Sequence, residues 1–321
     1  MTPFAIAGIQ MHVAALRENV SAMRHQVDLL MSRFPWTQMV VFSELAPYGP
    51  LPEFAKPLPS PAEAAFQEMA ARHGIWLLPG SMFEQRGDAV YNTASVIDPQ
   101  GRVVGRYSKM FPFKPFEVGI ASGVEPLVFD VPAVGRFGVS ICYDIWFPET
   151  TRLLTSLGAE VLLHPVLTGT IDRDVELSIA RATSAMFQCY VFDINGVGAG
   201  SLGRSAVFDP AGVCLHQASV GEEMIPVEID MDQVRRQRAV GMNGLGQPLK
   251  SFRDRAAEFS IYDRDRPMTP YLQQLGPLEM PARGGRGGLD GSLVPQDMGL
   301  GADVLSQEAA VYLEGEDMAG R

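Results

Sequence analysis

The chain of 321 residues has only three cysteines, Cys142, Cys189 and Cys214. Three thiols cannot all pair with one another, and their spacing contains no Cys-x-x-Cys motif of a metal or redox site. Sparse, unpaired cysteine is typical of a reducing compartment, so we expect a cytoplasmic protein. Histidine is also scarce. The five histidines are dispersed and lack the spacing of metal ligands, so we expect no metal site.

Positive charge and long apolar runs are scarce as well. The chain carries 26 Lys and Arg against 37 Asp and Glu, for a formal net charge of −11. A general binder of nucleic acids or anionic membranes needs a basic face, so this balance argues against both partners. No apolar stretch is long enough to span a membrane. The first residues, Thr2 to Gln10, lack the basic region of a signal peptide and are expected to form a core strand.

The sequence does contain three apolar, strand-like runs that each end in one reactive side chain. They are Met-Val-Val-Phe-Ser before Glu44, Val-Val-Gly-Arg-Tyr-Ser before Lys109, and Phe-Gly-Val-Ser-Ile before Cys142. A thiol is a weak nucleophile until it loses its proton, a nearby ammonium stabilises the thiolate, and a carboxylate can accept the proton. Together these three groups are the parts needed to attack a carbonyl or nitrile carbon.

Helical and extended patterns alternate along the chain. Apolar residues at helical spacing predict a helix over 15–34, and Ser60 followed by Pro61 is typical of a helix start, with Gly74 as the end of that helix. Two pairs of extended runs, each joined by Asp-Pro-x-Gly, predict hairpins. These pairs are 89–97 with 102–107 and 205–208 with 213–216. Hairpins interleaved with β-α units favour a mixed sheet over a purely parallel one.

Two glycine-rich segments need separate interpretation. The run from Gly198 to Gly203 matches G-x-G-x-x-G, but strand and turn patterns follow it where a dinucleotide site needs a helix, so we interpret it as a loop. From about Gly276 the chain becomes Gly-rich and then acidic. We therefore predict one domain over 1–275 and a tail over 276–321, either loosely ordered or docked as an oligomerisation arm.

The three reactive segments, taken in chain order, resemble the nitrilase superfamily of carbon–nitrogen hydrolases, with similarity over about residues 4–265. In that family a Glu, a Lys and a Cys in this order form the active site, with a second Glu shortly after the Lys. The matching segments are Phe-Ser-Glu44-Leu, Tyr-Ser-Lys109-Met, Lys-Pro-Phe-Glu117 and Ile-Cys142-Tyr-Asp-Ile-Trp-Phe-Pro-Glu. The resemblance implies an α/β fold, the four-layer-forming α-β-β-α sandwich of this family.

The resemblance also implies a catalytic role for each match. Cys142 would attack the substrate carbon, while Glu44 would take the thiol proton, pass it to the departing ammonia or amine and then activate water. Lys109 would lie beside the developing oxyanion with the backbone N–H of Tyr143. Glu117 would position the substrate amide or orient Lys109. Because side chains and backbone supply the nucleophile, the base and the oxyanion site, no metal or cofactor is needed.

Three further residues are candidates for contact with the substrate. Tyr143 and Trp146 follow the nucleophile closely, and His164 ends a strand near the predicted site. His164 has an alternative interpretation as a structural histidine with satisfied hydrogen bonds.

The residues after the nucleophile narrow the range of expected substrates. Nitrilases resemble one another in having Trp-Glu there, whereas amide and carbamoyl hydrolases more often have another aromatic or Arg followed by Asp, as in Tyr143-Asp144. The following run is similar to that of N-carbamoylputrescine amidohydrolases, which have Trp in place of Tyr143.

The chain also departs from the family's Arg-Ala-x-Glu-Asn-type segment, where it carries Met186 and Phe187. This departure predicts a more apolar wall of the substrate pocket or a more apolar interface. We predict a hydrolase of small linear amides, with an N-carbamoyl amine second and a nitrile third.

Other classes of function stay open. A scaffold or non-catalytic subunit would have no need of the intact set of Glu44, Lys109, Glu117 and Cys142. Acyl transfer to an amine uses the same thioester as hydrolysis, so the sequence does not separate these two reactions. Members of the family resemble one another in pairing through their helical layers. This implies a homodimer or a larger even homo-oligomer, with the helix around Met186 as a candidate contact.

Overall fold

The computed structural model describes residues 1–114, 116–263, 272 and 274–278. One compact unit comprises Met1–Phe113 and Glu117–Ser260, and a second comprises Lys114–Phe116 and the chain from Ile261 onward. Of the tail predicted over 276–321, all but 276–278 lies outside the described residues. The boundary at residue 275 therefore stays a prediction.

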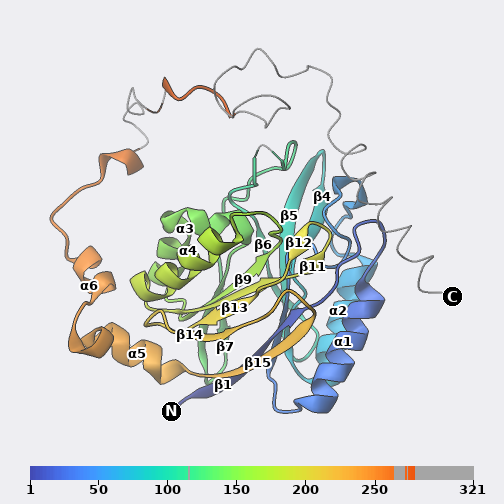
Figure 1. The fold of residues 1–321 in the computed structure, drawn as a ribbon, viewed down its shortest axis with the longest axis horizontal. Coiled ribbons are helices and arrows are strands. Elements are labelled where there is room, and N and C mark those ends of the chain that lie inside the picture. Colours follow the sequence, from blue (N-terminus) through green and yellow to red (C-terminus); the bar gives the residue numbers. More distant parts are fainter. Residues whose placement is uncertain (115, 264–271, 273, 279–321) are drawn as a thin grey trace. The chain divides into compact units, whose positions relative to one another are not determined.

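Two β-sheets form the centre of the first unit (Figure 1). The seven strands of the first sheet are β1 Pro3–Gln10, β2 Met39–Phe42, β3 Trp76–Leu78, β4 Met82–Arg86, β5 Ala89–Ile97, β6 Val103–Ser108 and β15 Glu223–Asp230. Their order is β15-β1-β2-β3-β5-β4, and β6 also pairs with β5. Strands β1, β2 and β3 are parallel, and antiparallel strands flank them.

The second sheet repeats this plan with a parallel centre and antiparallel edges. Its six strands are β7 Leu127–Val131, β8 Gly135–Val139, β9 Val161–Val166, β10 Tyr190–Asn195, β13 Ala206–Phe208 and β14 Cys214–Gln217. Their order is β14-β13-β10-β9-β8-β7. A two-stranded ribbon, β11 Val197–Gly198 with β12 Ser201–Leu202, lies outside both sheets.

Helices cover the outer face of each sheet, so the unit has four layers (Figure 1). The pair α1 Val20–Arg33 and α2 Pro61–His73 packs on the first sheet, and the pair α3 Pro148–Ser156 and α4 Arg173–Met186 packs on the second. The remaining helices are α5 Met231–Val240, α6 Pro248–Arg253 and the 3-10 turns η1 Pro52–Phe54, η2 Cys142–Trp146, η3 Met242–Gly244 and η4 Ser260–Tyr262. This arrangement confirms the predicted α-β-β-α sandwich.

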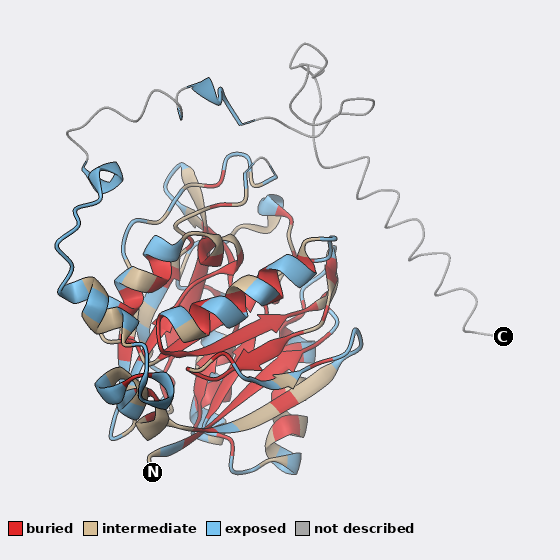
Figure 2. Cartoon of the chain, turned by 60° about the vertical axis from the view of Figure 1, so that its left-hand side comes forward, coloured by how far each residue is buried: buried red, intermediate tan, exposed pale blue. Residues whose placement is uncertain are grey.

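Alternating side chains along β1 show how one strand serves two layers. Phe4 and Ile6 belong to the core between the sheets, where the Phe4 ring meets Phe137 of the opposite sheet. Ala7 and Ile9 belong to the core beneath α1 and α2. Since every second residue of a strand faces the same side, β1 must be apolar throughout to bury both faces. The sheets are accordingly the most buried part of the unit (Figure 2).

Local sequence signals account for several element boundaries. The Ser60 hydroxyl caps α2 by accepting from the Glu63 N–H at 3.2 Å, and Gly74 ends that helix in the left-handed conformation with φ 64°. In both predicted hairpins the aspartate of the Asp-Pro-x-Gly turn accepts backbone N–H groups two and four residues later. These hairpins are β5–β6 and β13–β14, as predicted.

The first helix begins later than its apolar spacing predicts. It starts at Val20 instead of residue 15, because the Asn19 side chain bonds both the N–H and the carbonyl of Ala14 at 3.0 Å. These bonds hold the preceding residues in a loop. The glycine run from Gly198 to Gly203 forms the β11–β12 ribbon and no helix follows it, in agreement with its interpretation as a loop.

Glu63 joins the outer helical layer to the first sheet. Its fully buried carboxylate accepts from the Ser95 hydroxyl on β5 at 2.7 Å, and from Arg106 Nε and Nη2 on β6 at 2.9 and 2.7 Å. We expect Glu63→Gln to lower the free energy of unfolding by about 2 kcal/mol, since it weakens hydrogen bonds to a charged group. Urea unfolding measures the change.

The matched control is Glu68→Gln on the same helix, which removes the exposed ion pair with Arg24. It should leave the unfolding midpoint near that of the wild type. Equal effects of the two substitutions would contradict the structural role of Glu63.

Candidate active site

Three of the predicted catalytic residues lie where strands of the two sheets end. Glu44 follows β2 and Lys109 follows β6 in the first sheet, while Cys142 opens η2 shortly after β8 of the second. The backbone N–H of Glu44 donates to the Val166 carbonyl at the end of β9 at 3.2 Å. The two sheets are therefore joined by a main-chain hydrogen bond beside these residues.

The Lys109 ammonium is the buried cation of the site. It is 1% exposed and donates to Glu44 Oε1 at 2.8 Å and to Glu117 Oε2 at 2.9 Å. Burial alone would lower the pKa of Lys109, but the charge of Glu44, with smaller contributions from Cys142 and Glu117, raises it well above its usual value. Lys109 therefore stays charged at neutral pH.

Asn92 on β5 completes this group, although it is not among the residues predicted from the sequence. Its Nδ2 donates to Glu44 Oε1 at 2.8 Å and to Glu117 Oε1 at 3.3 Å. Burial raises the pKa of Glu44, the charge of Lys109 lowers it and the charge of Glu117 raises it, and the net direction is upward. A carboxyl group with a raised pKa beside a thiol is suited to accept and return a proton.

Asp144 holds the turn that carries the nucleophile. Its Oδ2 accepts from the Tyr107 hydroxyl at 2.6 Å and from the Ile141 N–H at 2.9 Å, and its Oδ1 accepts from the Phe111 N–H at 2.8 Å. Burial raises the pKa of Asp144 to about 6 despite these bonds. Because Tyr107 belongs to β6, Asp144 links the Cys142 turn to the strand that positions Lys109.

Cys142 sits in a strained and buried position. Its φ of 45° lies in the left-handed region that a residue with a side chain rarely adopts, and it is 8% exposed. Burial and the charge of Glu44 raise the pKa of its thiol well above the usual value, Glu176 raises it further, and Lys109 acts in the opposite direction. The thiol is therefore protonated at neutral pH and needs an adjacent base to become a nucleophile.

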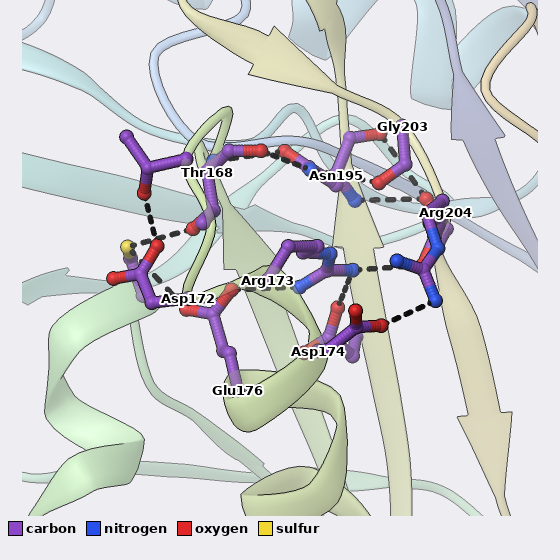
Figure 3. A network of polar contacts seen from close by, with 12 residues as sticks. Thr168, Asp172, Arg173, Asp174, Glu176, Asn195, Gly203 and Arg204 are labelled. Atoms are coloured by element: carbon purple, nitrogen blue, oxygen red, sulfur yellow. Dashed lines mark hydrogen bonds and ion pairs between the residues drawn. The ribbon is translucent and has the colours of Figure 1, made fainter.

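A second buried ion cluster contains Arg173 and Glu176 of α4 (Figure 3), and Glu176 brings it next to the Cys142 sulfur. Arg173 Nη1 donates to Glu176 Oε2 at 2.7 Å, and Arg173 Nη2 donates to Asp193 Oδ1 at 2.5 Å and to the Arg204 carbonyl at 2.9 Å. Glu176 Oε1 and the Thr168 hydroxyl each lie 3.9 Å from Cys142 Sγ. Burial and Asp193 raise the pKa of Glu176 to about 7, although Arg173 opposes the shift.

The residues of this cluster are not among those predicted from the sequence. Arg173 and Glu176 occupy two positions of α4, and Asp193 comes from β10, about twenty residues later. One signal was available, since Asp193 is a charged residue within the apolar run Tyr-Val-Phe-Asp-Ile-Asn and a buried carboxylate needs a partner. Nothing in the spacing indicates that the partner is an arginine of the preceding helix.

The three predicted substrate contacts have different surroundings. Tyr143 and Trp146 of η2 are partly exposed, with ring centroids 6.0 Å apart, and Tyr143 also packs against Phe113 and Phe147. His164 is fully buried, and its Nδ1 is 2.8 Å from the Ser140 hydroxyl. Burial lowers the pKa of His164 to about 4, so this ring is neutral at pH 7. A role of these residues in substrate binding stays a prediction.

Two further properties concern the described residues alone. They contain no group of three or more His, Cys, Asp and Glu side chains that could hold a metal ion. Within them, no helix combines the length and apolar character that crossing a bilayer requires.

Comparison with known proteins finds a matching family, similar sequences and similar structures. The carbon-nitrogen hydrolase family model matches residues 5–239. Omega-amidase NIT2 of Danio rerio is 26% identical over 260 residues, which cover 72% of this chain and 90% of the relative. The 2-oxoglutaramate amidase of Bacillus subtilis is 31% identical over 182 residues, which cover 54% of this chain and 68% of the relative. A mutant amidase of Nesterenkonia sp. AN1, solved in complex with butyramide, superposes with a TM-score of 0.65 at 22% identity, covering 74% and 94%.

Because Lys109 is buried between carboxylates, its removal should change the free energy of unfolding in a pH-dependent way. Lys109→Met leaves the Glu44 and Glu117 carboxylates without their cation, and removing one member of such a group costs about 4 kcal/mol of unfolding free energy. Without Lys109 the pKa of Glu44 rises further, so the loss should be smaller at pH 5 than at pH 8. A raised pKa in the folded state favours folding at low pH and loses that effect as the pH rises. Urea unfolding at both pH values tests this.

The control is Lys56→Met, which removes an exposed lysine. We expect it to change stability little, and equally at both pH values. A pH-independent loss in Lys109→Met would contradict the assignment of Lys109 as the cation that holds these carboxylates ionised.

Proposed function

This chain belongs to the carbon–nitrogen hydrolase family of the nitrilase superfamily, and we propose that it cleaves small linear amides through a thioester on Cys142. As a member of this family it is an amidase-type hydrolase of C–N bonds other than peptide bonds. The observation that carries the finer proposal is a buried thiol whose pKa responds to the charges of Glu44 and Lys109, while Lys109 and Asn92 hold the Glu44 carboxyl group in place. Nucleophile, base and fixed positive charge are thereby adjacent.

The proposed reaction begins with proton transfer from the Cys142 thiol to Glu44. The sulfur then attacks the amide carbon, and the oxygen of the resulting tetrahedral intermediate carries a negative charge beside Lys109 and the Tyr143 N–H. Because Lys109 is already fixed between two carboxylates, little reorganisation is needed when this charge develops. Glu44 returns the proton to the departing ammonia, and the acyl group remains on the sulfur as a thioester.

The second half of the reaction uses the same residues. Glu44 takes a proton from water, the hydroxide attacks the thioester, and collapse of the intermediate releases the carboxylate and restores the Cys142 thiol. Glu117 accepts from Lys109 and from the Phe113 N–H, and Asn92 joins it to Glu44, so we assign Glu117 a positioning role. It orients Lys109 while Glu44 moves the proton.

The relatives favour an amide over the alternatives. Two of them are named for the amides that they cleave, and a structural neighbour was solved with butyramide. The Tyr143-Asp144 sequence after the nucleophile is also typical of amide and carbamoyl hydrolases. An N-carbamoyl amine is therefore the second candidate substrate, and a nitrile is the third. Acyl transfer to an amine uses the same thioester and is an alternative outcome of the second step.

We expect ammonia release from simple aliphatic amides, and we expect Cys142→Ala to lower kcat/KM by about 10⁴-fold or more, as loss of a nucleophile does in other hydrolases. Propionamide, butyramide, a matched N-carbamoyl amine and butyronitrile form the panel. Added hydroxylamine should intercept the thioester as a hydroxamate. Circular dichroism shows whether the variant is folded.

Three results would contradict this proposal. They are release from the nitrile alone, release that survives Cys142→Ala, or ammonia release from an amide without hydroxamate at high hydroxylamine. A hydroxamate formed faster than the free acid at low hydroxylamine would instead favour the acyl-transfer alternative.

We also propose that the protein acts in the cytoplasm as a homodimer or larger even homo-oligomer. Apolar side chains remain exposed on the outer helices, among them Leu153 of α3 and Val175 and Met186 of α4, of which Met186 is 48% exposed. Its neighbour Phe187 is buried beneath the second sheet's helices. The two apolar residues predicted to repack this segment therefore divide between the core and the surface.

Sedimentation velocity at micromolar concentration tests the assembly. We expect a dimer or a larger even species, and Met186→Glu should shift the profile toward the monomer because it places a charge at an apolar contact. A wild-type profile that contains only monomer would contradict the assembly.

A further inference from the structure

The active site contains a second carboxylate at the nucleophile, and the proposed mechanism does not use it. Glu176 is 2% exposed, and its two oxygens have different tasks. Oε2 is held by Arg173 at 2.7 Å, whereas Oε1 faces Cys142 Sγ at 3.9 Å. Among the described residues, no cation other than Arg173 pairs with Glu176.

The charges of the Lys109 and Arg173 ion clusters are also unbalanced. Each of the two cations holds two carboxylates, Glu44 and Glu117 at Lys109 and Glu176 and Asp193 at Arg173. With all six groups ionised, these paired residues carry a net charge of −2. Burial and the charge of Asp193 raise the pKa of Glu176 to about 7, so this carboxyl group is partly protonated at pH 7 until a positive group binds beside it. Within the described part of the chain, Asp193 Oδ2 is buried without a hydrogen-bond partner. Buried negative charge without a counter-charge is unfavourable, so the site would gain from a positive group in the substrate.

We propose that Glu176 is a specificity-determining residue that selects amides with a protonated amine on the carbon next to the scissile carbonyl. This inference rests on the proposed function, since it places the substrate's acyl carbon at Cys142 Sγ. In the thioester such an amine is three bonds from the sulfur, within reach of an oxygen that lies 3.9 Å from that sulfur. The ammonium would donate to Glu176 Oε1, with the Thr168 hydroxyl beside it.

The same contact has a consequence for the nucleophile. The negative charge of Glu176 disfavours the Cys142 thiolate. A substrate ammonium bound at Oε1 offsets that charge, so a cationic substrate assists formation of the thiolate that attacks it. A neutral amide leaves the carboxylate uncompensated beside the sulfur. The preference for cationic over neutral amides should therefore appear in kcat as well as in KM.

The test uses three amides that differ in a single substituent on the carbon next to the carbonyl. They are alaninamide with an ammonium, lactamide with a hydroxyl and isobutyramide with a methyl group, each supplied as both enantiomers where it is chiral. We expect wild-type kcat/KM to be about 10²-fold higher for alaninamide than for isobutyramide, because a site built for a polar group strongly disfavours analogues that lack it. Ammonia release at pH 7 is the readout.

Glu176→Gln keeps the shape of the side chain and an oxygen that can accept from Arg173 but removes the charge. We expect it to reduce the preference for alaninamide over isobutyramide at least tenfold. The matched control is Asp174→Asn, which removes a neighbouring carboxylate of α4 that pairs with Arg204 at the surface. It should leave the preference unchanged.

The outcomes separate this inference from the proposed function. Cys142-dependent hydrolysis with isobutyramide equal to or better than alaninamide would overturn the role of Glu176 and leave the amidase function standing. An equal loss on all three amides in Glu176→Gln would also overturn it, since that result indicates a general structural or oxyanion role. Absence of hydrolysis of every amide in the panel would overturn the proposed function itself.

Modification of Cys142 provides a readout that does not need turnover. In a Cys214→Ser background, which removes the exposed thiol, we compare methanethiosulfonates that carry an aminoethyl, an ethyl or a sulfonatoethyl group. The thiolate attacks the reagent's sulfenyl sulfur, forms a mixed disulfide and releases methanesulfinate. We expect the cationic reagent to react about tenfold faster than the neutral one, and Glu176→Gln to reduce this ratio. A ratio unaffected by Glu176→Gln would overturn the inference.

Discussion

A fully buried ammonium is tolerated only where carboxylates neutralise it, and Lys109 places this constraint on the whole site. To meet it, the end of β2 must bring Glu44, and the loop after β6 must turn back to bring Glu117. Asn92 of β5 then shares its amide between the two carboxylates. The charge of Lys109 thus fixes side chains from three strands of the first sheet. The position of Glu44, the proposed base, follows from its role in neutralising Lys109.

The nucleophile comes from the opposite sheet, so the site exists only when the sheets are packed together. Polar links cross this boundary beside Cys142: Asp144 accepts from Tyr107 and from the Phe111 N–H, and the Glu44 N–H donates to the Val166 carbonyl. The apolar side chains between the sheets stabilise their packing but do little to fix the position of one sheet relative to the other, because apolar contacts are not directional. The directional bonds of Asp144 therefore determine where the strained turn at Cys142 meets the cation.

The parts of the fold that sequence predicts well are those set by local chemistry. The Asp-Pro-x-Gly turns and the ends of α2 depend on side chains that bond their own backbone within a few residues. The three strand-end residues could be found because a reactive side chain after an apolar run is conspicuous. Asn92, Arg173 and Glu176 could not be assigned, since their partners lie far along the chain and their own surroundings are ordinary for a strand or a helix.

The two buried ion clusters act differently on the nucleophile. Lys109 favours the Cys142 thiolate, whereas the cluster around Arg173 disfavours it, because Arg173 leaves a carboxylate oxygen of Glu176 facing the sulfur. Burial and the charge of Glu44 are the larger causes of the raised pKa of this thiol, and a protonated thiol is protected from oxidation and from indiscriminate attack on electrophiles. A group that arrives with the substrate and offsets the charge of Glu176 shifts this balance at the moment of binding. The same arrangement that makes the free thiol unreactive thereby connects its activation to recognition of the substrate.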